Sequence, residues 1–196
     1  MKKALGAVPA VFPMPVLMIA AYDENGKVNV MNAAWGMISE MNKITLFIGE
    51  GHKTTQNIHK TKAFTVALAD REHMEAADFF GIATGNMMED KFERTGFTAV
   101  KSEFVNAPVI EEFPVVMECE LEQTIYTDTF HAVVGKIVNT SAEEKVLDEN
   151  GKIDPEKIDA LVFDIFQNGY YVVGEKVGKA WNAGANMMKA AKAEQK

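Results

Sequence analysis

The segment from Val115 to Ile125 alternates apolar and acidic residues more strictly than any other part of the chain. Successive side chains of a β-strand point to opposite faces, so this period of two predicts a strand. One face carries Val115, Met117, Cys119 and Leu121, and the other carries Glu118, Glu120 and Glu122. We expect the apolar face to be buried and the glutamate row to be solvated, which makes an antiparallel sheet the basis of the fold.

Several further segments favour strands, and fewer favour helices. An Asn25-Gly26 turn joins two apolar runs and predicts a hairpin. The expected strands are 16–22, 27–31, 44–48, 63–69, 115–125, 130–138 and 170–173. The expected helices are 54–58 capped by Thr54 or Thr55, 71–82, 86–94 and 154–161 after the cap Asp154-Pro155. This order predicts a mainly β protein, a β-barrel with inserted helices, rather than a doubly wound sheet.

The composition is that of a globular chain, and we expect a single domain over residues 1–196 with a helical tail at about 180–196. The net charge of −8 argues against nucleic acid and anionic membrane surfaces as partners. The single cysteine, Cys119, excludes an internal disulfide and a thiolate metal site, so we predict no metal and a cytoplasmic location. Three prolines interrupt the apolar segment after Lys3, which we interpret as an extended lead-in to a strand rather than a signal peptide or membrane span.

The common catalytic motifs are absent. Gly49-Glu50-Gly51 does not continue into a dinucleotide-binding glycine motif, and Gly51-His52-Lys53-Thr54 lacks the spacing of a P-loop. No serine-hydrolase or zinc-protease motif is present. The order His73-Met74-Glu75 matches part of a zinc deaminase motif, but the required second cysteine is missing.

The segment His52-Lys53-Thr54-Thr55 follows a predicted strand and opens a predicted helix. Free backbone N–H groups and the positive end of the helix dipole attract anions at such a position. Lys53 adds a full charge, and the hydroxyls of Thr54 and Thr55 add donors that a phosphate accepts. A plain helix start with a solvated lysine is the alternative.

The segment from Asn29 to Trp35 suits a planar heterocycle. Asn29 and Asn32 offer donors and acceptors to a ring edge, small Ala33 and Ala34 let a ring approach the backbone, and Trp35 adds a flat surface. A strand end with a half-buried tryptophan is the alternative.

These two segments, taken in order with others, resemble the flavin reductase-like proteins, which include the flavoredoxins and have an FMN-binding split barrel. The resemblance covers roughly residues 8–180. It rests on Pro15-Val-Leu-Met-Ile, Asn25-Gly26, Asn29-Val-Met-Asn-Ala-Ala-Trp35, His52-Lys-Thr-Thr-Gln-Asn-Ile58, Thr84-Gly85, Asp90-Lys91-Phe92, Ala107-Pro-Val109, Met117-Glu-Cys119, Asp128-Thr-Phe-His131, Val134-Gly135, Gly169-Tyr170-Tyr171 and Gly174-Glu175. Thr84 stands where serine is commoner in the family.

The resemblance implies a homodimer with one FMN per subunit at the subunit interface. It also implies an oxidoreductase, either a flavin reductase or a flavoredoxin-like electron carrier, with NAD(P)H or a redox protein as electron donor. The residues that it places near the flavin are Asn29, Asn32, Ala33, Ala34, Trp35, Lys53, Thr54, Thr55, Thr84, Lys91, His131 and Phe166. No side chain needs to act as nucleophile or base, because the cofactor carries the chemistry.

Two alternatives stay open. A non-enzymatic protein could bind or store FMN without turnover, and a split-barrel relative could take another ligand, as pyridoxamine-phosphate oxidase-like or heme-handling proteins do. Without the resemblance, His131 in an apolar strand is more often a core histidine, and Cys119 on the core face is a small inert hydrophobe.

Overall fold

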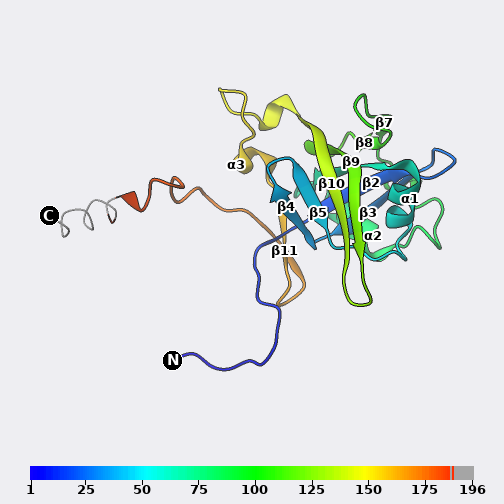
Figure 1. Ribbon diagram of the computed structural model, residues 1–196. Coiled ribbons are helices and arrows are strands. Elements are labelled where there is room, and N and C mark those ends of the chain that lie inside the picture. The colour runs from blue at the N-terminus through cyan, green and yellow to red at the C-terminus, as the bar shows by residue number, and fades with distance from the viewer. Residues whose placement is uncertain (186, 188–196) are drawn as a thin grey trace.

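The computed structural model describes residues 1–185 and 187, and it is built around one seven-stranded antiparallel sheet (Figure 1). The strand order is β3(Val28–Ala33), β2(Leu17–Tyr22), β6(Ala63–Leu68), β9(Val115–Tyr126), β10(His131–Ala142), β5(Lys43–Leu46) and β4(Gly36–Glu40). Only Ala34 and Trp35 separate the two edge strands, β3 and β4, in the chain. The sheet must therefore curl until its edges approach each other, as the prediction of a barrel requires.

Smaller elements surround this sheet. A three-stranded sheet contains β1(Met14–Pro15), β11(Leu161–Asp164) and β12(Gly169–Val172), and a hairpin pairs β7(Ala99–Lys101) with β8(Pro108–Ile110). The helices are α1(Lys53–Thr61), α2(Met74–Ile82) and α3(Pro155–Ile158), with short 3₁₀ turns η1(Glu93–Thr95) and η2(Glu144–Val146). Among the described residues, no helix is long and apolar enough to cross a membrane.

The strand β2 is buried on both faces, which explains its uninterrupted apolar sequence. Met18 and Ala20 belong to a core cluster with Phe80 of α2, whereas Leu17 and Ile19 belong to a second cluster with Phe64 and other side chains of the main sheet. Two cores therefore share the same central strands. This arrangement fixes α2 and the three-stranded sheet against one face of the barrel.

The strand β9 confirms the predicted alternation but corrects the solvated glutamate row. Glu120 and Glu122 are exposed, whereas Glu118 is buried and accepts hydrogen bonds from Asn139 Nδ2 at 2.6 Å and from Ser102 Oγ. The loop after β7 covers this end of the strand, and its polar groups replace water around the carboxylate. On the opposite face Cys119 is fully buried, and burial raises the pKa of its thiol to about 12, which suits an inert core residue.

Most strand predictions are confirmed, and the errors fall where tertiary contacts outweigh local preference. The predicted helix 86–94 is wrong: turns lead into η1 there, and adjacent Lys91 and Phe92 are both buried, which a surface helix would not allow. The helix after Asp154 ends at Ile158, and the following apolar run forms β11 instead. Strands β1, β4, β7 and β8 were not predicted, because they are short or lie at sheet edges.

The segment before β1 and the described segment after β12 lead away from the barrel (Figure 1). Residues 1–13 contain neither helix nor strand, as expected for an extended lead-in. Residues 180–184 form turns, residues 185 and 187 are helical, and the rest of the predicted helical tail lies outside the described residues.

Candidate functional site: a groove along β3

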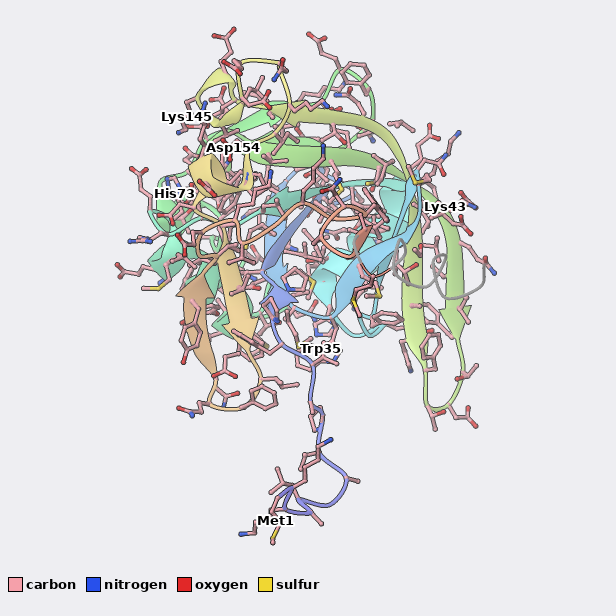
Figure 2. All side chains as sticks on the ribbon, turned by 90° about the vertical axis from the view of Figure 1, so that its left-hand side faces the viewer. Met1, Trp35, Lys43, His73, Lys145 and Asp154 are labelled. Atoms are coloured by element: carbon pink, nitrogen blue, oxygen red, sulfur yellow. The ribbon has the colours of Figure 1, made fainter. Side chains whose placement is uncertain are left out.

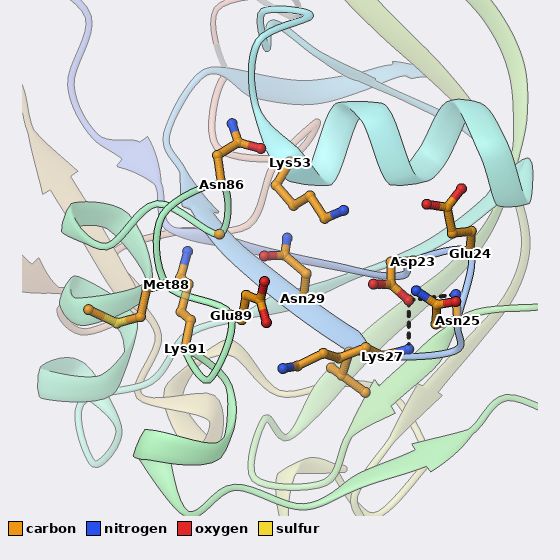
Figure 3. A pocket seen from close by; sticks show the side chains of 12 residues that line it. Asp23, Glu24, Asn25, Lys27, Asn29, Lys53, Asn86, Met88, Glu89 and Lys91 are labelled. Atoms are coloured by element: carbon orange, nitrogen blue, oxygen red, sulfur yellow. Dashed lines mark hydrogen bonds between the residues drawn. The ribbon is translucent and has the colours of Figure 1, made fainter.

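A groove runs along β3 from the turn at Asp23 to Trp35 and consists of three adjoining cavities. The lysine end, of about 350 Å³, lies between the 23–27 turn and the loop after α2 (Figure 3). The middle, of about 330 Å³, shares Asn29, Lys53, Gly85 and Lys91 with the lysine end. The aromatic end, of about 390 Å³, shares Met31, Asn32, His52, Gly81 and Ile82 with the middle. Shared walls make these cavities one elongated groove.

The first turn of α1 forms one wall. His52 is the N-cap with extended backbone angles, and no side chain caps the helix, which corrects the prediction that Thr54 or Thr55 does so. Free N–H groups of this turn can therefore serve an anion. Lys53 lines the lysine end and the middle, and it makes no ion pair within the described part of the chain.

Asn29 connects β3 to this helix start. Its Nδ2 donates to the hydroxyl of buried Thr54 at 2.6 Å. A Cβ on Gly85 would lie 2.2 Å from Asn29 Oδ1, so only glycine lets the loop after α2 approach β3 this closely. The groove is thus closed on three sides by β3, α1 and that loop.

Lys91 is the most unusual charged residue of the groove. Its side chain is 3% exposed, and its Nζ donates to the backbone oxygen of Phe80 at 2.9 Å and lies 5.8 Å from the centre of the Phe80 ring. Within the described residues no carboxylate pairs with it. Burial lowers the pKa of Lys91 to about 8, because a charged ammonium group is poorly solvated there. An anion in the groove would supply the missing counter-charge.

Flat and small side chains form the aromatic end. Ala33 and Ala34 leave the backbone accessible, and the Trp35 ring lies 6.4 Å from the Phe163 ring at 44°. Asn32 is held in place, since its Nδ2 donates to Ala77 O at 2.9 Å. In Figure 2 Trp35 lies between the three-stranded sheet and the β9–β10 hairpin.

One polar pair at the aromatic end comes from two other elements. The Tyr170 hydroxyl of β12 donates to Asp78 Oδ1 of α2 at 2.9 Å. Burial, followed by the interaction with Asp78, raises the pKa of Tyr170 to about 12. The phenol therefore remains a hydrogen-bond donor at neutral pH.

The structure brings together nine of the twelve predicted site residues. These are Asn29, Asn32, Ala33, Ala34, Trp35, Lys53, Thr54, Thr84 and Lys91. Thr55 is fully buried and lines none of the three cavities, because its side chain lies on the core side of α1.

His131 and Phe166 also lie outside the groove. His131 is on β10 with its ring 5.3 Å from that of Tyr126, and its buried Nδ1 has no hydrogen-bond partner among the described residues. Phe166 is exposed, and the centre of its ring lies 6.4 Å from the centre of the Phe12 ring.

Sequence reasoning missed His52, Asp78, Phe163 and Tyr170 as individual wall residues. His52 stood in a segment already singled out, and Tyr170 stood in a predicted strand. Nothing in the sequence around Asp78 indicated a site residue, since acidic residues are common within helices.

Comparison with known proteins identifies this architecture as the split barrel of flavin reductase-like proteins. Residues 10–164 match the model of the flavin reductase like domain, and the chain belongs to this family. Membership places it among flavin-related oxidoreductases and electron-transfer proteins.

Two solved structures and one sequence relative illustrate the similarity. Flavoredoxin of Desulfovibrio vulgaris (Miyazaki F) is 34% identical with a TM-score of 0.89, over 94% of this chain and 100% of that one. Flavoredoxin from Methanosarcina acetivorans is 26% identical with a TM-score of 0.86, over 96% and 100%. An uncharacterized protein of Aquifex aeolicus is 26% identical over 157 residues, which are 75% of this chain and 78% of the relative.

The buried charge of Lys91 gives a prediction for the ligand-free protein. The folded state disfavours the charged lysine, so the unfolded chain binds more protons between pH 8 and 10.5, and stability rises with pH in that window. We expect Lys91→Met to raise the free energy of unfolding at pH 7 by about 1–3 kcal/mol, with a difference that shrinks toward pH 10. Urea unfolding across this pH range measures it.

Lys53→Met is the matched control, because Lys53 is a partly exposed lysine of the same groove. It should change stability little and equally at all these pH values. A Lys91→Met protein that is less stable than the wild type by the same amount throughout would contradict the assignment of a strained buried charge.

Proposed function

We propose that the protein is an FMN-binding flavoprotein oxidoreductase that holds FMN along the β3 groove. The observation that carries this proposal is a continuous groove in which Lys53 and Lys91 line the middle, with no carboxylate among the described residues there, and aromatic and small residues line the aromatic end. This donor set fits a ligand that has an anionic group joined to a planar ring.

The phosphate of FMN would lie at the junction of the lysine end and the middle. Lys53 and Lys91 would supply charge, and the N–H groups at the start of α1 would donate hydrogen bonds. The exposed hydroxyl of Thr84 lines the same part of the groove. Thr54 would act indirectly, since its hydroxyl already accepts from Asn29 and fixes that amide.

The ring of FMN would lie along Asn32, Ala33, Ala34 and Trp35 at the aromatic end. Bound FMN would supply the redox chemistry, as its ring accepts a hydride or single electrons from NAD(P)H or a protein donor and passes them on. The chain would bind and orient the ring and shield it from water. His131 and Phe166 have no place in the groove of their own chain, and the proposal gives them no contact with FMN there.

An anaerobic absorption spectrum tests this function and separates it from FMN storage. We expect the protein to bind FMN and its flavin bands to bleach on addition of NADH or NADPH. Bands that bleach only with dithionite would indicate a carrier fed by another protein, or storage. Failure to bind added FMN would overturn the proposal and leave a split-barrel protein with another ligand.

We further propose that the protein is a homodimer. Support comes from a group of exposed apolar side chains near the aromatic end, here called the apolar edge: Trp35, Met37, Ile38, Met41, Phe47 and Phe130. Met37 and Ile38 lie on β4, an edge strand, and are 63% and 55% exposed. Exposed apolar side chains along an unpaired edge strand are typical of protein–protein interfaces.

Analytical ultracentrifugation tests the dimer. We expect a mass of twice 21.6 kDa for the wild type and 21.6 kDa for Met37→Lys/Ile38→Lys at micromolar concentration. Val100→Lys places a charge at an exposed apolar residue on β7, outside the apolar edge, and should leave the dimer intact. A wild-type monomer would contradict the proposal.

A further inference from the structure

The aromatic end of the groove contains a carboxylate, that of Asp78, which forms no ion pair with any described residue. Asp78 is the one acidic residue among the described residues that line this cavity, and no lysine or arginine lines it. The middle of the groove is thus lined by Lys53 and Lys91 without a carboxylate, whereas the aromatic end is lined by a carboxylate without a lysine or arginine.

Three elements hold this carboxylate in place. Asp78 lies on α2, and its hydrogen-bond partner Tyr170 lies on β12. The centre of the Tyr170 ring lies 6.2 Å from the centre of the Phe163 ring of β11. The preceding residue of α2, Ala77, accepts the amide of Asn32 from β3. The barrel and the three-stranded sheet thus meet at Asp78, so its position follows from packing and not from a mobile side chain alone.

The Tyr170 hydroxyl has a second effect on the charge. Because it donates to Asp78, its dipole offsets part of the carboxylate's field within the cavity. The carboxylate is stabilised without being neutralised by a cation. A group bound at the aromatic end would still experience a negative potential.

A flavin bound with its phosphate near Lys53 and Lys91 would place its ring beside Asp78. Reduction increases electron density and negative charge on that ring. A nearby carboxylate opposes such a change, and the opposition is strong where water is excluded. The lysines act in the opposite direction but line the lysine end and the middle of the groove and not the aromatic end.

We propose that the charge of the Asp78 carboxylate, held in place by Tyr170, lowers the reduction potential of flavin bound in this groove. The inference rests on the proposed function. With the Asp78 charge, the FMN-loaded protein would be a stronger electron donor than the same protein without it. Tyr170 limits the effect, because its hydroxyl donates a hydrogen bond to the carboxylate.

Redox titration of the FMN-loaded protein against reference dyes tests this inference. We expect Asp78→Asn to shift the midpoint potential in the positive direction, equivalent to roughly tenfold tighter binding of reduced relative to oxidised FMN. Tyr170→Phe should shift it in the negative direction. Asp78→Asn/Tyr170→Phe should resemble Asp78→Asn, because the hydroxyl acts through the carboxylate.

Two further variants make the result specific. Glu75→Gln removes a charge from an exposed residue of the same helix and should leave the potential unchanged. Asp78→Glu keeps the charge and should retain a potential near that of the wild type, which a merely structural role would not predict.

An Asp78→Asn protein that binds FMN with the wild-type potential would overturn the inference. A wild-type protein that binds no FMN would instead overturn the proposed function. If Asp78→Asn fails to fold, the opposite shift in Tyr170→Phe and the wild-type potential in Asp78→Glu still decide the question, and an unchanged Tyr170→Phe potential would count against it.

Discussion

The ammonium group of Lys91 lies inside the protein, and within the described residues its one hydrogen-bond partner is the backbone carbonyl of Phe80. Burying an unpaired charge costs several kcal/mol, which is a large part of the net stability of a domain. Lys91 therefore has to be held there by the rest of the fold. The two cores around β2 and the close approach of Gly85 to Asn29 fix the loop that carries it. The buried charge of Lys91 therefore lowers the stability of the ligand-free protein, and an anionic ligand would offset this loss by pairing with the ammonium group.

The same logic connects the two ends of the groove. Lys53 and Lys91 favour negative charge that is present in every redox state, as in a phosphate. Asp78 opposes negative charge that appears only on reduction. One set of charges would thus determine affinity and the other would determine the balance between redox states. Both depend on packing, because water would screen them if the loop after α2 or the three-stranded sheet moved away.

The sequence allowed much of this arrangement to be predicted where the signal is local. The Asn25-Gly26 hairpin, the alternation along β9 and the cap at Asp154 each depend on a few neighbouring residues, and each is observed. The walls formed by Asn29–Trp35 and by the start of α1 were predicted for the same reason. Thr55 does not line the groove, because the direction of one helical side chain depends on how the helix packs.

Other features depend on segments far apart in the chain, and no local pattern indicates them. Glu118 is buried only because the loop after β7 lies over it, and the Asp78–Tyr170 pair joins residues 92 positions apart. Residues 86–94 do not form the expected helix, because Lys91 and its neighbour Phe92 are both buried. Such positions violate the usual local preferences, and in this protein two of the three line the groove, as expected for a functional site.

The most direct test of this account compares the affinities of the wild-type protein for FMN and for riboflavin at pH 7, measured by fluorescence quenching. Riboflavin has the same ring but no phosphate, so the ratio isolates the lysine end of the groove. Two charge-assisted contacts predict that FMN binds about a hundredfold more tightly. Equal affinities would contradict the account, because the buried charge of Lys91 would then have no ligand to balance it.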